Sequence, residues 1–317
     1  MTSDSHAGLM TAPASLNSAA SVSADPPPLK VSNRHWTRFV GSAISLLLLA
    51  AVVYQLRFLD LHQLWNLLPT SVAFWAAFAV AYMITPFSDW VIFRRLWHLP
   101  VNGIAALVRK MVSNDLLLNY IGEVYFYTWA RRNAAITAAP FGAIKDVSIL
   151  SALAGNVVTL VLVLLCWPWF GFLHRNVQGN SIEYSILFVL GLSLIITLFR
   201  NRLFSLPTRD LWITTGIHMI RIFVSLILTA YMWNCLMPEL DLVWLLLLST
   251  LRLLLSRLPF VPNKDLTFAA LAAFFVGHDN IVVMVMTLMA SISFAAHLLV
   301  GAVLGALDLV KEGQSST

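Results

Sequence analysis

The sequence VSILSALAGNVVTLVLVLLCWPWFGFL, residues 147–173, decides the fold. It contains no Asp, Glu, Lys or Arg, and it exceeds the roughly 20 apolar residues that a helix needs to cross a bilayer. The whole chain shares this character, because 59% of its 317 residues are hydrophobic and only 11% are charged. A soluble domain carries about 25% charged residues. The composition therefore excludes an ordinary soluble protein and predicts an all-α polytopic membrane protein.

Further runs with few or no charges approach the same length. Together they predict six spanning helices, at residues 39–56, 71–93, 147–173, 184–199, 211–233 and 281–307. Two more apolar regions, 104–130 and 242–277, are interrupted by polar and charged residues. Such interruptions are tolerated at membrane depth where the chain is buried in protein or lines a cavity. Each region therefore predicts a helical hairpin, either re-entrant or short.

The cations give these segments an orientation. Three of them precede the first span, between residues 30 and 38, and place the amino terminus in the cytoplasm by the positive-inside rule. Threading the chain from there puts most other cations on the same side, in segments 94–110, 131–145 and 200–209 and in the carboxyl-terminal tail. The net charge of +5 is then a consequence of topology. It gives no reason to expect a nucleic acid partner.

The order span, span, hairpin, span occurs twice. The first set begins in the cytoplasm and the second begins outside, which is the pattern of the inverted-topology repeats found in transporters. We therefore divide the chain into a disordered, Ser/Ala/Pro-rich cytoplasmic tail at 1–29, a first membrane repeat at 30–173, a second at 174–310 and a short cytoplasmic tail at 311–317.

Polar side chains inside the apolar segments are the candidates for function. Ionisable groups at membrane depth are costly unless they face a cavity or a partner. The candidate substrate-binding residues are Asn119, Glu123, Arg221, Arg252, Arg257, Lys264 and Asp265. Glu123 and Asp265 each precede an apolar helix, where an acidic residue also caps the helix amino terminus. Capping and substrate binding both stay open for these two carboxylates.

Arg221 lies within a predicted span, three residues after His218, so the two side chains share one helix face. Its charge requires a partner, for which Asp89, Glu123 and Asp265 are the candidates. A structural ion pair and a substrate contact are both open for Arg221.

Three other polar side chains have simpler interpretations. Asp89 and Asp146 lie near the cytoplasmic interface, beside basic residues, and surface pairing explains them. His297 in the last span is interpreted as a core histidine with its hydrogen bonds satisfied.

Enzyme signatures are absent from the sequence. It has no Gly-rich phosphate loop, no HExxH motif and no His/Cys/Asp cluster at metal-ligand spacing. It also has no hydrophilic stretch long enough for a nucleotide-using domain. We expect no catalytic residues, no metal and no cofactor.

Two short motifs carry a family resemblance. The tripeptide IGE at 121–123 and the stretch LPFVP at 258–262 resemble the two re-entrant segments of the transmembrane family of lysylphosphatidylglycerol synthases, which includes the flippase module of the multiple-peptide-resistance factor. The resemblance extends from about residue 36 to the last span. Asn119 and Tyr120 replace the usual proline before Gly-Glu, and residues 263–265 replace a Gly-rich turn and Glu, which indicates a divergent, stand-alone member.

The resemblance implies lipid handling and not lipid aminoacylation, because the 317 residues contain no soluble aminoacyl-transferring domain. We expect a bacterial inner-membrane protein that moves an anionic or glycosylated envelope lipid between leaflets. One alternative is an accessory subunit of a separately encoded lipid-modifying enzyme. Another is an intramembrane lipid transferase with Glu123 as general base. Membrane lipids are the expected partners, and an enzyme partner and a homo-oligomer stay open.

Overall fold

A computed structural model describes residues 68–117, 121–133, 140–169, 204–257 and 280–315, together with a few single positions between residues 187 and 195 and Phe268. These residues form seven helices and no strand, which confirms the expected all-helical class. The helices are α3 (Val72–Trp97), α4 (Gly103–Leu116), α5 (Ile121–Asn133), α6 (Pro140–Cys166), α8 (Thr208–Leu236), α9 (Leu242–Ser256) and α11 (Asn280–Ser315).

Four of these helices, α3, α6, α8 and α11, are long and apolar enough to cross a membrane. They correspond to four of the predicted spans and make the chain a multi-pass membrane protein. The other two predicted spans, 39–56 and 184–199, lie outside the described residues, apart from helical positions between 187 and 195. The predicted inverted repeat and the boundaries of the two halves therefore stay predictions.

Helix α6 begins at Pro140, before the uncharged run that starts at residue 147. The two charged residues just before this run, Lys145 and Asp146, are part of the helix. The start of an uncharged run therefore marks where the polar interface ends and not where the helix begins.

The hairpin of α4 and α5 is the described part of the region predicted at 104–130. Its arms have 14 and 13 residues, which at 1.5 Å per residue gives about 20 Å for each arm. The hydrocarbon core is about 30 Å thick. The described arms are shorter than this core, and the adjoining residues 118–120 and 134–139 lie outside the described residues, so the re-entrant and the short alternatives both stay predictions. Helix α9, the first arm of the second predicted hairpin, is short as well, with 15 residues.

A close approach of α4 and α5 depends on Gly122. Its backbone N–H donates a hydrogen bond of 2.8 Å to the Oδ1 atom of Asn114 on α4. A Cβ at this position would collide with the backbone carbonyl of Lys110. The glycine of the IGE motif is therefore required by packing.

Helix α3 is locally weakened in its second half. Pro86 lies inside it and lacks the N–H that would continue the helical hydrogen bonding. Two residues later, the hydroxyl of Ser88 donates to the carbonyl of Ile84 over 2.7 Å. The helix ends at Trp97 and is capped by His98, whose φ of 54° is left-handed.

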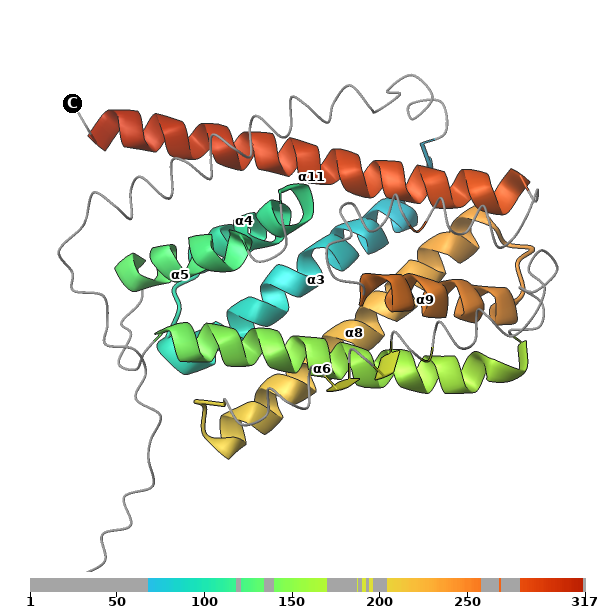
Figure 1. The fold of residues 1–317 in the computed structure, drawn as a ribbon. Coiled ribbons are helices and arrows are strands. Elements are labelled where there is room, and N and C mark those ends of the chain that lie inside the picture. The colour runs from blue at the N-terminus through green and yellow to red at the C-terminus, as the bar shows by residue number, and fades with distance from the viewer. Residues whose placement is uncertain are drawn as a thin grey trace, which may run out of the picture.

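The helices pack so that their basic ends lie together. In Figure 1, α3 and α11 end at the side of the bundle where α6 and α8 begin. An ion pair of 3.2 Å joins Arg95, in the last turn of α3, to Asp210, in the first turn of α8. Helix α4 packs against α3 and α11, α6 packs against α8 and α9, and α5 contacts α6. This arrangement brings α3, α4, α5, α6 and α8 around one interior region.

Candidate functional site

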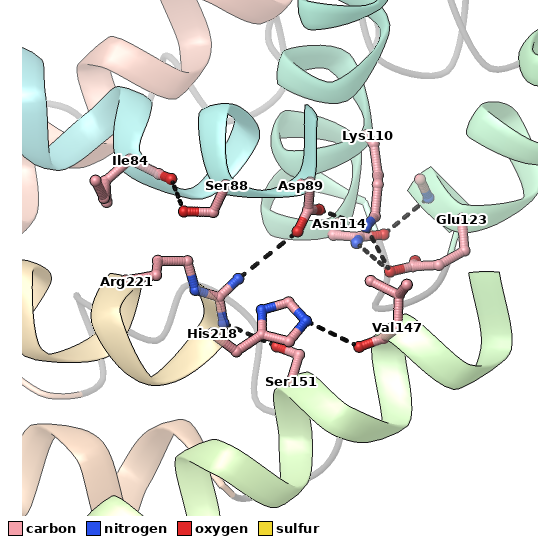
Figure 2. A network of polar contacts seen from close by, with 11 residues as sticks. Ile84, Ser88, Asp89, Lys110, Asn114, Glu123, Val147, Ser151, His218 and Arg221 are labelled. Carbon is pink, nitrogen blue, oxygen red and sulfur yellow. Dashed lines mark hydrogen bonds and ion pairs between the residues drawn. The ribbon is translucent and has the colours of Figure 1, made fainter. Parts of the chain in front are cut away.

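A buried ion pair between α3 and α4 lies at the centre of this region. The Nζ atom of Lys110 donates to Oδ2 of Asp89 over 2.8 Å. Only 6% of Asp89 and 8% of Lys110 are exposed. Figure 2 shows that their side chains point toward each other from adjacent helices. Removing two charges from water costs several kcal/mol per ion, so each of these groups depends on its partner.

Glu123 joins the pair from α5. Its Oε1 atom is 3.8 Å from Nζ of Lys110 and accepts a hydrogen bond of 3.2 Å from the amide of Asn114. Lys110 and Asn114 are four residues apart, so both face α5 from the same side of α4. Glu123 also lies in the first turn of α5. An acidic residue is favourable there, so capping and substrate binding both stay open for Glu123.

Arg221 reaches the same region from α8. Its guanidinium is 3.9 Å from Oδ1 of Asp89 and donates to the hydroxyl of Ser151 on α6 over 2.8 Å. His218, one turn earlier, is completely buried, and its Nε2 atom is 3.2 Å from the carbonyl oxygen of Val147. The expected shared face of His218 and Arg221 is confirmed. We call Asp89, Lys110, Glu123 and Arg221 the charge cluster (Figure 2).

Arg257 lies at the end of α9, next to α6. A Cβ placed on Gly155 would collide with its guanidinium, so this glycine makes room for the cation. Nε of Arg257 donates to the hydroxyl of Ser256 over 3.1 Å. No carboxylate of the described residues pairs with Arg257, and its positive charge is close enough to repel that of Arg221. Because Gly155 follows Ser151 by four residues, the two arginines meet one face of α6 a turn apart.

The cluster answers one question that the sequence left open. Of the three carboxylates considered as partners for Arg221, Asp89 provides the contact. The interpretation of Asp89 as a surface-paired residue is therefore wrong. The nearby arginines find other partners, because Arg95 pairs with Asp210 and Arg94 stacks 4.8 Å above the ring of Trp90. Proximity in sequence does not reveal that the Asp89 carboxylate points away from them, toward α4 and α8.

Surface pairing is also an incomplete explanation of Asp146. Its carboxylate is 3.5 Å from the adjacent Lys145, yet Asp146 is completely buried. The Oδ2 atom accepts backbone hydrogen bonds from Ser205 and Leu206, of 2.6 and 2.8 Å. Asp146 therefore holds the segment before α8 against the start of α6, which no local pattern in the sequence indicates.

The remaining predicted site residues are only partly placed. Arg252 lies on α9, about one turn before Arg257, and is partly buried. Asn119, Lys264 and Asp265 lie outside the described residues. Lys110 belongs to the site although the sequence presented it only as a cation on the cytoplasmic side. The sequence feature that could have identified Lys110 is its position four residues before Asn114, near the polar tip of the predicted hairpin.

A second polar contact links α11 to two other helices. Nδ1 of His297 is 3.1 Å from the hydroxyl of Tyr82 on α3, and Nε2 is 3.5 Å from the carboxylate of Asp115 on α4. The expectation that His297 has partners is confirmed. One of them, Asp115, belongs to the polar tip of the first hairpin.

The charges around the cluster do not balance. Among the described residues, Lys110, Arg221 and Arg257 supply three positive charges, and Asp89 and Glu123 supply two negative ones. The Oε2 atom of Glu123 is buried and has no hydrogen-bond partner in the described part of the chain. Within the described part of the chain, the site therefore has positive charge available for an anion and one acceptor available for a donor. The described residues contain no group of three His, Cys, Asp or Glu side chains placed to hold a metal ion.

No protein-family model, curated protein or solved structure matches this chain. The resemblance to the lysylphosphatidylglycerol synthase family therefore enters below as part of a proposal.

Proposed function

We propose that this protein moves a lipid with an anionic head group between the leaflets of a bacterial inner membrane. The observation that carries the proposal is the excess of positive charge at Arg221 and Arg257, inside a bundle whose long helices have the length and hydropathy of membrane spans. Uncompensated charge at this depth is costly. Among the described residues no carboxylate pairs with Arg257, and an anionic substrate would supply the missing counter-charge.

The phosphate of a lipid fits the two arginines. Guanidinium groups bind phosphate oxygens through paired, charge-assisted hydrogen bonds. Neighbouring positions on one helix face, such as Ser151 and Gly155, are about 5–6 Å apart at Cβ, so two guanidiniums held there can bind one phosphate from two sides. A bound phosphate would also remove the repulsion between Arg221 and Arg257. The acyl chains would stay in the hydrocarbon.

Glu123 supplies the complementary polar group. Its unpartnered Oε2 atom can accept a hydrogen bond from a hydroxyl or amine of the head group. Asn119, Lys264 and Asp265, which lie outside the described residues, stay predicted substrate-binding residues. Alternating access would arise if the two halves rock against each other, as in transporters built from inverted repeats. The resemblance to the lysylphosphatidylglycerol synthase family points to the same activity.

A leaflet-resolved assay tests the proposal. Purified protein is reconstituted in liposomes with a fluorescent phosphatidylglycerol, and an impermeant quencher reports how much probe changes leaflet. We expect wild-type protein to accelerate translocation, Arg257→Gln to reduce the rate at least tenfold, and Arg257→Lys to retain part of it. Arg209→Gln is the matched control, because Arg209 is an exposed arginine on α8, away from the cluster. It should translocate like wild type.

The alternative is a non-transporting accessory subunit whose charges only hold helices together. The direct contact of 2.8 Å between Lys110 and Asp89 favours a structural role for at least that pair. If folded wild-type protein moves neither phosphatidylglycerol nor lipids of a native envelope extract, the transport proposal fails and the accessory role gains. If Arg257→Gln and Arg209→Gln both translocate normally, transport stands but the phosphate site does not.

A further inference from the structure

A histidine on α11 joins three helices outside the charge cluster. The Nδ1 atom of His297 is 3.1 Å from the hydroxyl of Tyr82 on α3, and its Nε2 atom is 3.5 Å from Oδ2 of Asp115 on α4. The rings of His297 and Tyr82 also contact each other, with centroids 5.1 Å apart. Each ring nitrogen therefore faces a group that can exchange a proton. We call Tyr82, Asp115 and His297 the His297 triad.

The triad suits both charge states of the imidazole. A neutral ring with its proton on Nε2 donates toward Asp115 and accepts from the Tyr82 hydroxyl at Nδ1. An imidazolium donates at both nitrogens, and Tyr82 then turns its oxygen toward Nδ1, because a phenolic hydroxyl both donates and accepts. The ring can thus gain or lose a proton without losing either partner, which is what a reversible proton site requires.

Asp115 provides the route for a proton. Its side chain is 44% exposed, whereas that of His297 is 16% exposed. A proton that arrives on the Asp115 carboxylate can pass to Nε2 when Nδ1 carries the other ring proton. One O–H bond is then exchanged for one N–H bond, and the product is an imidazolium beside an ionised carboxylate. Chains of Asp, Glu and His inside spanning segments form such proton relays in pumps and transporters.

The other charged groups of the packed helices have partners elsewhere. On α4, Arg109 stacks on an aromatic ring of α5, and Lys110 bonds Asp89 of α3. The two arginines in the last turn of α3 have the partners described above. On α11, residues 280–307 include no Asp, Glu, Lys or Arg. In the described part of the chain, the titratable side chains that contact His297 are therefore the two other members of the triad.

The triad is connected to the charge cluster through two helices. Asp115 directly follows Asn114, whose amide donates to Glu123. Tyr82 precedes Asp89 by seven residues, about two turns on one face of α3. Helix α11 itself packs along α4 (Figure 1). A change of charge in the triad therefore acts on both helices that form the buried ion pair.

We propose that His297 binds and releases a proton in each translocation cycle and so couples lipid movement to a proton gradient. The inference rests on the proposed function and adds its energy source. Imidazole changes charge between about pH 5 and 8, the range across which a membrane maintains a proton gradient. The imidazolium holds α11 to α4 through Asp115, and release of the proton weakens this contact and lets the helices separate.

A pH gradient tests the coupling in the liposome assay with fluorescent phosphatidylglycerol. Rates are measured with about pH 7.5 on both sides, about pH 6 on both sides, and one value on each side. We expect the gradient to raise the wild-type rate at least threefold above either symmetric condition. Nigericin, which collapses the gradient, should abolish the increase.

Two histidine variants show whether the response belongs to the triad. His297→Gln keeps hydrogen-bonding groups but takes up no proton, so its translocation rate should not respond to the gradient. His98→Gln is the matched control, because it makes the same change at an exposed histidine beyond the end of α3. Its rate should respond like that of wild type.

A second measurement reports protonation without transport. The full chain is labelled with ¹⁵N-histidine in micelles, and nuclear magnetic resonance follows the ring nitrogens from about pH 5 to 8. The signal that is missing in His297→Gln identifies His297, and we expect it to become an imidazolium signal at the acid end. A ring that stays neutral throughout would overturn the proposal.

The outcomes separate the proton site from the proposed function. Wild-type translocation that ignores the gradient, or a gradient response that persists in folded His297→Gln, would contradict the proton coupling and leave lipid transport standing. If folded wild-type protein moves no lipid under any of the three conditions, lipid transport itself fails and the coupling fails with it. The gradient response of wild type decides the matter even if His297→Gln does not fold.

Discussion

Asp89 determines whether the cations of the cluster are tolerated in the interior. It bonds Lys110 directly and is the described carboxylate closest to Arg221. We expect Asp89→Asn to lower the free energy of unfolding by about 3–5 kcal/mol, because it leaves a buried ammonium without its counter-charge. Denaturant unfolding of the purified protein in mixed micelles measures this loss.

The double variant Asp89→Asn/Lys110→Met separates pairing from packing. Removing both charges avoids the isolated ammonium, so the double variant should be more stable than Asp89→Asn alone. Losses that simply add would show that the two residues are not coupled. If the protein is unfolded in both variants, the contact of Asp89 with Arg221 contributes more to stability than its contact with Lys110.

At the scale of elements, hydropathy predicted the long helices, because a span must be apolar over most of its length whatever it packs against. It did not predict where α6 begins, because burial of Asp146 depends on the segment before α8. Nor did it decide between a re-entrant and a spanning hairpin. The described lengths of α4 and α5 bear on that distinction, although the end of α5, with two arginines in its last turn and Asn133, carries a stop signal in the sequence.

The short hairpin makes a prediction about access. In a chain whose two native cysteines are replaced by alanine, Leu117→Cys marks the end of α4 near the tip. An impermeant maleimide applied from the side opposite the basic helix ends should fail to label it, because a 20 Å arm does not cross a core of about 30 Å.

Two exposed positions calibrate the labelling. Val101→Cys, just before α4, should react from the basic side, and Glu239→Cys, between α8 and α9, should react from the opposite side. Rapid labelling of Leu117→Cys from the Glu239 side would show that the hairpin spans the membrane.

For the molecule as a whole, the order of charges along the sequence predicted which helix ends lie together. The same sequence predicted the site residues only one by one. The sequence placed the ends of α3 and α11 and the starts of α6 and α8 on one side, and these helix ends lie together in the bundle (Figure 1). The site residues were predicted singly, from charge at membrane depth. That rule selected Glu123, Arg221 and Arg257. It counted Lys110 only as a cation on the cytoplasmic side, because the contact with Asp89 forms only when α4 folds against α3.

The side of the membrane that these basic ends face is the last prediction. Cytoplasmic loops are enriched in Lys and Arg, so the basic ends and the carboxyl terminus should be cytoplasmic. Green fluorescent protein fused after Thr317 should be fluorescent, and alkaline phosphatase at the same position should be inactive. Alkaline phosphatase fused after Glu239, at the opposite end of α8, should be active. The reverse pattern would invert the protein in the membrane, and the α4–α5 hairpin would then enter from the outer face, which would change the leaflet from which the proposed lipid first reaches Arg221.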